Sequence, residues 1–304
     1  MGKIALVFSG QGAQYSGMGK ELYDISPMAK EVFDIADSVK SGTSDMCFNG
    51  EKADLDITIN TQPCVFAVDL ASAKAVSELG VTPDYVAGFS LGEISALAFS
   101  EILTTKQAFE LVTKRAEYMQ SATLENNGAM AAILKLPSDK VEEICSKFTD
   151  AWPVNYNSPL QTVVAANENV IDEVLTTVKL EKGKGVYLAV SGAFHSPYMN
   201  SASVALSKYL ENVELSAPTT PIYSNVTALP YSGDFKSLIT KQVNNPVKWQ
   251  TIVENLIAEG VDTFIEVGPG KTLSGLIKKI NANVTTYNVE NAQTLQNLKE
   301  SLGL

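Results

Sequence analysis

The stretch that decides the fold is residues 85–98, which reads Tyr85-Val86-Ala87-Gly88-Phe89-Ser90-Leu91-Gly92-Glu93-Ile94-Ser95-Ala96-Leu97-Ala98. The first part is typical of a short buried strand, and the part from Ser90 onward is typical of a helix. Gly88 and Gly92 flank Ser90 in the pattern Gly-x-Ser-x-Gly, which places a serine hydroxyl on a tight strand-to-helix turn. We interpret Ser90 as a nucleophile in preference to a small residue that only allows close packing.

A serine nucleophile needs a base, and His195 is the only histidine in the chain. Imidazole is the usual base near neutral pH, so His195 is the predicted partner of Ser90. The backbone N–H of Leu91, which follows the nucleophile at the start of a helix, is expected to stabilise a developing oxyanion. No motif surrounds a third acidic member, although Asp234, Asp262 and Glu266 lie downstream. A backbone carbonyl could orient the imidazole instead.

Working outward from this turn, strands alternate with helices along the chain, which predicts an α/β fold with a parallel sheet. Strands are expected at 3–8, 85–89, 222–226 and 263–267, and helices at 61–79, 90–98, 106–121, 201–210 and 249–258. The pattern of expected elements changes near Gly128, where a compact β-α-β-α-β run has strands at 129–134, 162–166 and 185–190. Its helices are expected at 138–147 and 170–178. We predict a core of residues 1–125 and 196–304 and an inserted subdomain of residues 126–195.

Composition excludes several classes of protein. The chain has 304 residues, 45% of them hydrophobic, and a net charge of −11, which argues against nucleic acid or an anionic membrane as the main partner. The apolar run after Met1 is too short to span a membrane. The 3 cysteines form no Cys-x-x-Cys pair, and a single histidine cannot build a zinc site, so no metal is expected. These features predict a reduced, cytoplasmic protein.

Arg115 is the only arginine, although the chain contains 23 Lys and Arg residues in total. Lysine replaces arginine well at exposed sites and fails mainly where a planar, two-pronged cation is required. Arg115 is therefore a candidate clamp for a carboxylate or phosphate. The alternative is an exposed helix cation paired with Glu117 or Glu110, which would contribute little.

Taken in order, several motifs together resemble the malonyl-CoA:acyl carrier protein transacylases of fatty-acid synthesis. The motifs are Gly10-Gln11-Gly12-Ala13-Gln14, Thr61-Gln62-Pro63, Gly88-Phe89-Ser90-Leu91-Gly92-Glu93, Arg115 with Met119-Gln120, Gly128-Ala129-Met130-Ala131-Ala132, Asn155-Tyr156-Asn157-Ser158-Pro159, Gly192-Ala193-Phe194-His195-Ser196, Gln242 with Asn245-Pro246-Val247, and Glu266-Val267-Gly268-Pro269-Gly270-Lys271. The resemblance spans nearly the whole chain. It implies an α/β-hydrolase-like core with an inserted ferredoxin-like subdomain.

The resemblance also implies roles for individual residues. Ser90 would be the nucleophile and His195 the base, oriented by the backbone carbonyl of Gln242. The amides of Gln11 and Leu91 would form the oxyanion hole. Arg115 would hold the malonyl carboxylate, and Phe194 would disfavour a branched acyl group.

In this resemblance the substrates are malonyl-CoA and acyl carrier protein, and no cofactor is needed. Two alternatives share the Ser90 turn: a serine thioesterase or esterase, and a catalytically silent protein that docks the carrier. The sequence departs from the family pattern at Phe89, where histidine is common, and at Ser9, where proline is common. Lysines 182, 184, 271, 278 and 279 are candidates for contact with an acidic carrier.

Overall fold

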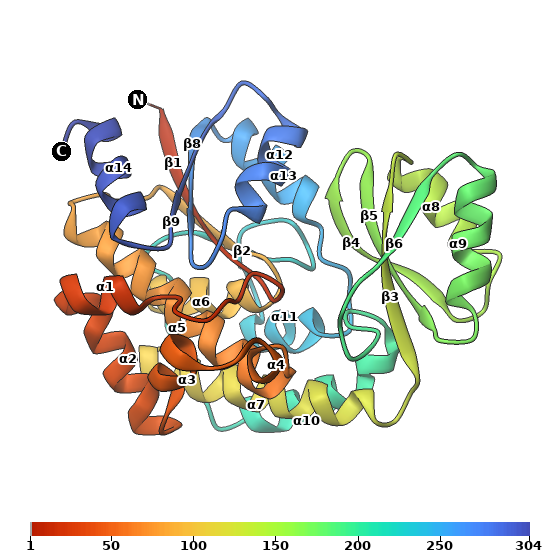
Figure 1. Ribbon diagram of the computed structural model, residues 1–304, viewed down its shortest axis with the longest axis horizontal. Helices are drawn as coiled ribbons and strands as arrows, with labels where there is room; N and C mark the ends of the chain where they lie inside the picture. Colours follow the sequence, from red (N-terminus) through yellow and green to blue (C-terminus); the bar gives the residue numbers. More distant parts are fainter. Residues whose placement is uncertain (1) are drawn as a thin grey trace.

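The computed structural model describes residues 2–304 and contains two separate sheets (Figure 1). The larger sheet is parallel throughout, in the order β7 (Ile222–Tyr223), β2 (Tyr85–Gly88), β1 (Lys3–Phe8), β8 (Val261–Val267) and β9 (Thr285–Val289). The smaller sheet is antiparallel, in the order β4 (Ala151–Ser158), β5 (Gln161–Asn167), β3 (Gly128–Leu134) and β6 (Lys184–Tyr187). The α/β prediction with a parallel core sheet is confirmed.

Helices cover both faces of the parallel sheet. In β1, Leu6 and Phe8 face one apolar core, whereas Ala5 and Val7 face the other. This burial on both faces explains why the strand reads as a continuous apolar run. The first core is packed by α1 (Lys20–Ile25), α2 (Pro27–Val39), α3 (Thr43–Asn49), α4 (Lys52–Leu55), α5 (Thr58–Glu78), α6 (Leu91–Phe99), α7 (Thr105–Thr123), α10 (Asn200–Leu210), α11 (Phe235–Gln242) and α14 (Ala292–Leu302). The second is packed by α12 (Trp249–Ala258) and α13 (Thr272–Ile280).

The antiparallel sheet has its own apolar core beneath α8 (Ser138–Cys145) and α9 (Ile171–Leu180). The element order β3-α8-β4-β5-α9-β6 is that of a ferredoxin-like unit. Figure 1 shows this unit beside the parallel-sheet core, with α8 and α9 on its outer side. The limits of the inserted subdomain at residues 126 and 195 stay a prediction.

The prediction of only three strands in the inserted unit is wrong, because the unit also contains β4. This strand lies at the edge of its sheet and contains Pro153, with register shifts on either side of Asn155. Proline and asparagine are depleted in strands, and proline is tolerated mainly at edges and bulges. The low strand propensity of these residues is therefore the reason that β4 was not predicted.

The start of α5 also differs from the expectation. The helix begins at Thr58, three residues before the expected start at residue 61, and Pro63 lies inside it. Proline inside a helix leaves the carbonyl four residues earlier without its N–H partner. The ammonium group of Lys40 donates a hydrogen bond to that carbonyl, Ile59 O, at 2.7 Å. A side chain that is distant in sequence thus compensates for the missing donor.

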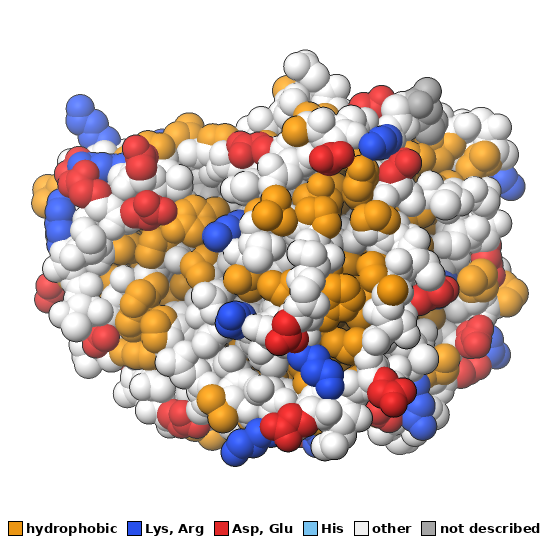
Figure 2. Space-filling model, turned by 180° about the vertical axis from the view of Figure 1, so that it is seen from behind, with side chains coloured by type: hydrophobic (Ala, Val, Ile, Leu, Met, Phe, Trp, Pro, Cys, Tyr) orange, Lys and Arg blue, Asp and Glu red, His pale blue; other side chains and the backbone are white. Residues whose placement is uncertain are grey.

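The structure also contains helices and strands that the sequence did not predict. Helices α1 to α4, α11 and α14 and strand β9 were not predicted, and β7 is only Ile222–Tyr223 where a strand over 222–226 was expected. A short 3₁₀ helix, η1 (Pro197–Met199), precedes α10. Across residues 2–304, no helix combines the length and the apolar character needed to cross a membrane. Figure 2 shows acidic and basic side chains interspersed on the face that it presents.

Candidate active site

Ser90 lies on a strained turn between β2 and α6. Its backbone has φ 55° and ψ −108°, which is unfavourable for a residue with a side chain and is typical of a nucleophile on such a turn. A Cβ atom on Gly92 would come within 2.3 Å of the carbonyl oxygens of Phe8 and Ser9, and one on Gly88 within 1.9 Å of Gly92. Both glycines are therefore required for β1, β2 and α6 to meet at this point.

His195 lies directly against the serine. Its Nε2 atom is 2.7 Å from Ser90 Oγ, and its Nδ1 atom is 2.8 Å from the carbonyl oxygen of Gln242. Its backbone N–H donates to Val243 O at 3.1 Å, so one segment fixes both ring and backbone. With Nδ1–H donating to Gln242, Nε2 is free to accept the Ser90 proton.

The electrostatics keep His195 neutral. Burial, together with the nearby positive charge of Arg115, lowers the pKa of His195 to about 4. An imidazole with this pKa is a free base throughout the neutral range. It is therefore ready to accept a proton.

The acidic residues considered downstream do not contact this histidine. Asp234 caps α11, and Asp262 accepts a hydrogen bond from the backbone of Gly2. Glu266 is buried and accepts from the backbone N–H groups of Leu273 and Ser274. Among the described residues the imidazole thus has a backbone carbonyl, and no carboxylate, as its second partner.

Arg115 is buried beside Ser90, with 1% of its surface exposed. Its Nη2 atom lies 3.1 Å from Ser90 Oγ and 2.8 Å from Gln242 Oε1, and its Nη1 donates to Gln62 Oε1. The alternative of an exposed cation paired with a glutamate is wrong, since Lys114 is the residue that pairs with Glu117. All the partners of Arg115 in residues 2–304 are neutral, and its Nε atom has none.

The two backbone N–H groups expected to stabilise the oxyanion lie in the segments that follow β1 and β2. Gln11 lies in the loop after β1, and Leu91 begins α6. Within residues 2–304, neither N–H has a hydrogen-bond partner. Parallel strands end at the same edge of a sheet, so the ends of β1 and β2 bring these two segments together.

These groups open into one cavity of about 270 Å³. Ser90, His195, Arg115, Gln11 and Phe194 all line it. Its apolar lining comes from the antiparallel sheet and the segment after it, with Met130, Ala132, Val163, Leu188 and Val190, and from the parallel-sheet core, with Met119, Leu273 and Leu276. The cavity therefore lies between the two sheets.

Phe89 occupies the position before the nucleophile and stacks edge-on against Trp249, with ring centroids 5.7 Å apart. It also borders the cavity, and its backbone carbonyl would lie 2.8 Å from a Cβ on Gly10. The aromatic ring thus supports the loop that carries Gln11 and supplies no polar group to Ser90.

Three residues for which the sequence predicted no role, Gln62, Asn225 and Glu93, hold the site together. Gln62 binds the guanidinium of Arg115, and Asn225 accepts the Ser90 N–H at 2.8 Å. Glu93 is fully buried and accepts from Asn225 N at 2.9 Å and Gln242 Nε2 at 3.3 Å. The available signal was Glu93 itself, which is the only charged residue in α6.

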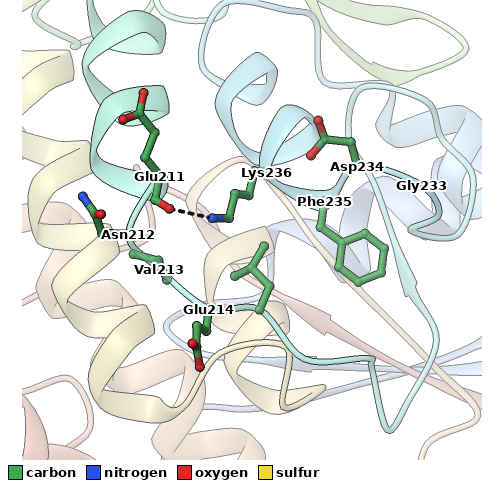
Figure 3. A pocket seen from close by; sticks show the side chains of 9 residues that line it. Glu211, Asn212, Val213, Glu214, Gly233, Asp234, Phe235 and Lys236 are labelled. Atoms are coloured by element: carbon green, nitrogen blue, oxygen red, sulfur yellow. Dashed lines mark hydrogen bonds between the residues drawn. The ribbon is translucent and has the colours of Figure 1, made fainter.

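A second hollow lies between the end of α10 and the start of α11 (Figure 3). Its lining includes Glu211, Glu214, Asp234, Phe235 and Lys236, and the Lys236 ammonium donates to the Glu211 carbonyl oxygen at 3.1 Å. None of these residues borders the Ser90 cavity. No group of histidine, cysteine and acidic residues suited to a metal ion occurs in the part of the chain that the structure describes.

A nucleophile elbow, a neutral imidazole and a buried cation around one cavity define an acyl-transferring serine enzyme. Comparison with known proteins agrees, because a family described as the acyl transferase domain matches residues 5–300. The chain belongs to this family.

The names of individual similar proteins state a more specific activity than the name of the family. The chain is 39% identical to the malonyl CoA-acyl carrier protein transacylase of Bacillus subtilis, over 99% of this chain and 98% of that protein. The crystal structure of the transacylase of the same name from Clostridium perfringens matches with a TM-score of 0.96 at 36% identity, covering 99% of this chain and 97% of that one. A malonyl-transacylase solved in complex with a type II polyketide acyl-carrier protein matches with a TM-score of 0.94 at 31% identity, over 98% and 99%.

Proposed function

We propose that this protein transfers a malonyl group from malonyl-CoA to the phosphopantetheine thiol of acyl carrier protein, through a malonyl ester on Ser90. One observation carries the proposal: Ser90 Oγ lies within hydrogen-bond distance of both His195 Nε2 and Arg115 Nη2. A nucleophile with its base on one side and a buried cation on the other fits an acyl group that ends in a carboxylate. The malonyl transacylases among the relatives support the same substrate.

In the first half-reaction, Ser90 Oγ attacks the thioester carbonyl while His195 Nε2 takes its proton. The negative charge that develops on the carbonyl oxygen is stabilised by the backbone N–H groups of Gln11 and Leu91. Loss of one such donor typically costs ~10²–10³ in rate. The tetrahedral intermediate collapses, the C–S bond breaks, and His195 returns the proton to the CoA thiolate.

The second half-reaction runs the same steps with the carrier thiol as nucleophile. His195 accepts the thiol proton, the sulfur attacks the malonyl ester, and Ser90 leaves with that proton. The Gln242 carbonyl keeps the imidazole in the required tautomer through both steps. Malonyl-CoA is a substrate, and the proposed chemistry uses no cofactor.

Arg115 selects the acyl group. Its guanidinium pairs with the malonyl carboxylate in a charge-assisted contact and so positions the thioester carbonyl above Ser90. Phe194, which also lines the cavity, is proposed to exclude a branch on the acyl chain. A neutral acyl group would leave the guanidinium without a carboxylate in direct contact, which favours malonyl over acetyl donors.

The test is the fate of the Ser90 ester. Incubation with malonyl-CoA is expected to add one malonyl group to Ser90, detected by intact mass, that persists until acyl carrier protein is added. Fast loss of the ester in water alone would support the thioesterase alternative. Absence of any added mass would support a protein that only docks the carrier.

The proposed function also predicts a surface that contacts the acyl carrier protein. The lysines at 182, 184, 271, 278 and 279 are all exposed, and Lys279 Nζ lies 3.2 Å from Gln161 Oε1 at the cavity. We propose that some of them contact an acidic carrier, so the rate of malonyl transfer to the carrier should fall as the salt concentration rises.

We also propose that the protein is cytoplasmic. The free, buried cysteines Cys47, Cys64 and Cys145 support a reducing environment.

A further inference from the structure

Beneath the proposed acyl site, Glu93 forms a buried charge that the proposed chemistry does not use. It lies on the first turn of α6, three positions after the nucleophile, and none of its surface is exposed. It accepts hydrogen bonds from Asn225 N, Gln242 Nε2 and the Tyr231 hydroxyl. All three partners are neutral, so no cation contacts this carboxyl group directly.

One amide side chain connects this group to Arg115. Gln242 Oε1 accepts from Arg115 Nη2 at 2.8 Å, and Gln242 Nε2 lies 3.3 Å from Glu93 Oε2. The same Nε2 also donates to Ser90 O. A buried positive and a buried negative group are therefore separated by one side chain, which is itself buried.

The balance of charge changes when a malonyl group binds. In the empty site, the charge of Glu93 offsets that of the Arg115 guanidinium, whereas Glu266, which also lines the cavity, is held by the backbone N–H groups of Leu273 and Ser274. A malonyl carboxylate on Arg115 would add a second negative charge to the same low-dielectric region, which is costly unless one of the two carboxylates becomes neutral. The malonyl carboxylate pairs directly with the guanidinium, whereas Glu93 reaches it only through Gln242.

We propose that Glu93 is a positioning and charge-balancing residue: it offsets Arg115 while the acyl site is empty and takes up one proton from solvent when a malonyl carboxylate binds. The proton goes to a Glu93 oxygen, and no other bond forms or breaks. The Tyr231 hydroxyl oxygen can accept a hydrogen bond from the protonated form, because a phenol both donates and accepts. This inference rests on the proposed malonyl substrate.

The titration properties of the surrounding groups are compatible with this role. Burial raises the pKa of Glu93 to about 7, although its hydrogen bonds and the charge of Arg115 oppose the shift. Burial lowers the pKa of Arg115 to about 10, so it stays charged, and that of His195 to about 4, so it stays neutral. Tyr231 stays protonated, because burial and then Glu93 raise its pKa. Asp69, on the neighbouring α5, accepts from Ser95 and does not contact Glu93.

The direction in which malonyl-CoA affinity changes with pH follows from the linkage between proton binding and ligand binding. A ligand that binds the protonated form of Glu93 more tightly loses affinity as pH rises through the pKa of the empty site, by at most about tenfold per pH unit. Acetyl-CoA has no carboxylate and carries the same CoA phosphates. The ratio of the two dissociation constants therefore isolates the contribution of the malonyl carboxylate.

The experiment measures binding of malonyl-CoA and acetyl-CoA to the full-length Ser90→Ala protein, which cannot form the ester. Calorimetry at pH 8 in two buffers with different ionisation enthalpies reports proton uptake. We expect about one more proton bound with malonyl-CoA than with acetyl-CoA, and a malonyl-to-acetyl Kd ratio that rises about tenfold from pH 7 to pH 8.5. Equal proton uptake for the two ligands would overturn the inference.

Variants identify the group that binds the proton. Glu93→Gln in the Ser90→Ala protein keeps an acceptor for Gln242 and Asn225 but cannot ionise, and it should abolish the extra proton uptake and flatten the Kd ratio. Asp69→Asn, a matched change at another buried carboxyl, should leave both unchanged. Retention of the proton uptake in Glu93→Gln would assign it to another group.

The outcome also separates the two proposals. A protein that binds malonyl-CoA without pH linkage contradicts only the role of Glu93. A protein that does not bind malonyl-CoA contradicts the proposed function itself. If Glu93→Gln failed to fold, equal proton uptake for malonyl-CoA and acetyl-CoA in the Ser90→Ala protein would still overturn the inference.

Discussion

The two sheets border the same cavity but contribute to it differently. The parallel sheet supplies loops at the ends of its strands, and these bring Gln11 beside Ser90. The antiparallel sheet supplies one of its faces, which combines apolar Met130, Ala132 and Val163 with polar Asn155, Asn157 and Gln161. Parallel strands all end at one edge, so distant loops converge there, whereas antiparallel strands end alternately at both edges. Chemistry is therefore concentrated on the first sheet and enclosure on the second.

The largest effect is expected from the parallel sheet. Ser90→Ala should reduce malonyl transfer by roughly 10⁴-fold or more, because no other group can form the ester. The matched control is Ser95→Ala on the same helix, where the hydroxyl donates to Asp69 and does not contact His195. Rate measurements on both should differ by orders of magnitude; comparable losses would contradict the assignment of the nucleophile.

Paired glycine changes compare how rigidly the two sheets are packed. An alanine Cβ at Gly92 would meet backbone carbonyls at 2.3 Å, whereas at Gly185 in β6 it would meet the tip of the Leu175 side chain at 2.4 Å. Backbone cannot move aside, but a flexible side chain can rotate. We expect Gly92→Ala to lower the free energy of unfolding by more than ~3 kcal/mol and Gly185→Ala by about 1 kcal/mol. Urea denaturation of both variants checks this, and equal losses would remove the distinction.

Arg115→Lys tests whether acyl selection belongs to the core. A lysine keeps the charge but loses the planar fork, so malonyl transfer should fall by about 10²-fold while the protein still folds. Steady-state kinetics with malonyl-CoA and circular dichroism provide the two readouts. Near-normal transfer by this variant would remove Arg115 from the substrate site.

The pH profile tests the histidine. Because the pKa of His195 is lowered to about 4, the base is already neutral at pH 6 and above. On the acid side, at saturating malonyl-CoA, formation of the malonyl ester should therefore not decline until pH falls to about 4. Stopped-flow or quench measurements, with folding monitored in parallel, check this. A decline centred near 6.5, with the fold intact, would show an imidazole that is not desolvated.

The smallest effect is expected on the outer edge of the antiparallel sheet. Val186 in β6 is 40% exposed and lies at the sheet edge. Val186→Thr conserves the branched shape, so the transfer rate should stay within about twofold and stability within ±0.5 kcal/mol. A large loss of transfer would show that this edge takes part in the reaction.

Much of the site was predictable because its signals are local. The strand–turn–helix around Ser90 was visible in the spacing of two glycines, and His195 and Arg115 stood out as the only residues of their kinds. The resemblance to a known family added Gln242, whose carbonyl does lie 2.8 Å from the imidazole. Strand β4 was missed because its stabilisation comes from pairing with β5, which overrides the poor strand propensity of Pro153.

By itself, the sequence determined the parallel α/β core and the residue types available for acyl transfer, since alternating elements and the elbow glycines act over short spans. Only the tertiary structure decided which neutral partners surround Arg115 and that Glu93 is linked to it through Gln242. These contacts join segments far apart in the chain. Burial, which is a property of the folded molecule alone, then sets the charge states on which the chemistry depends.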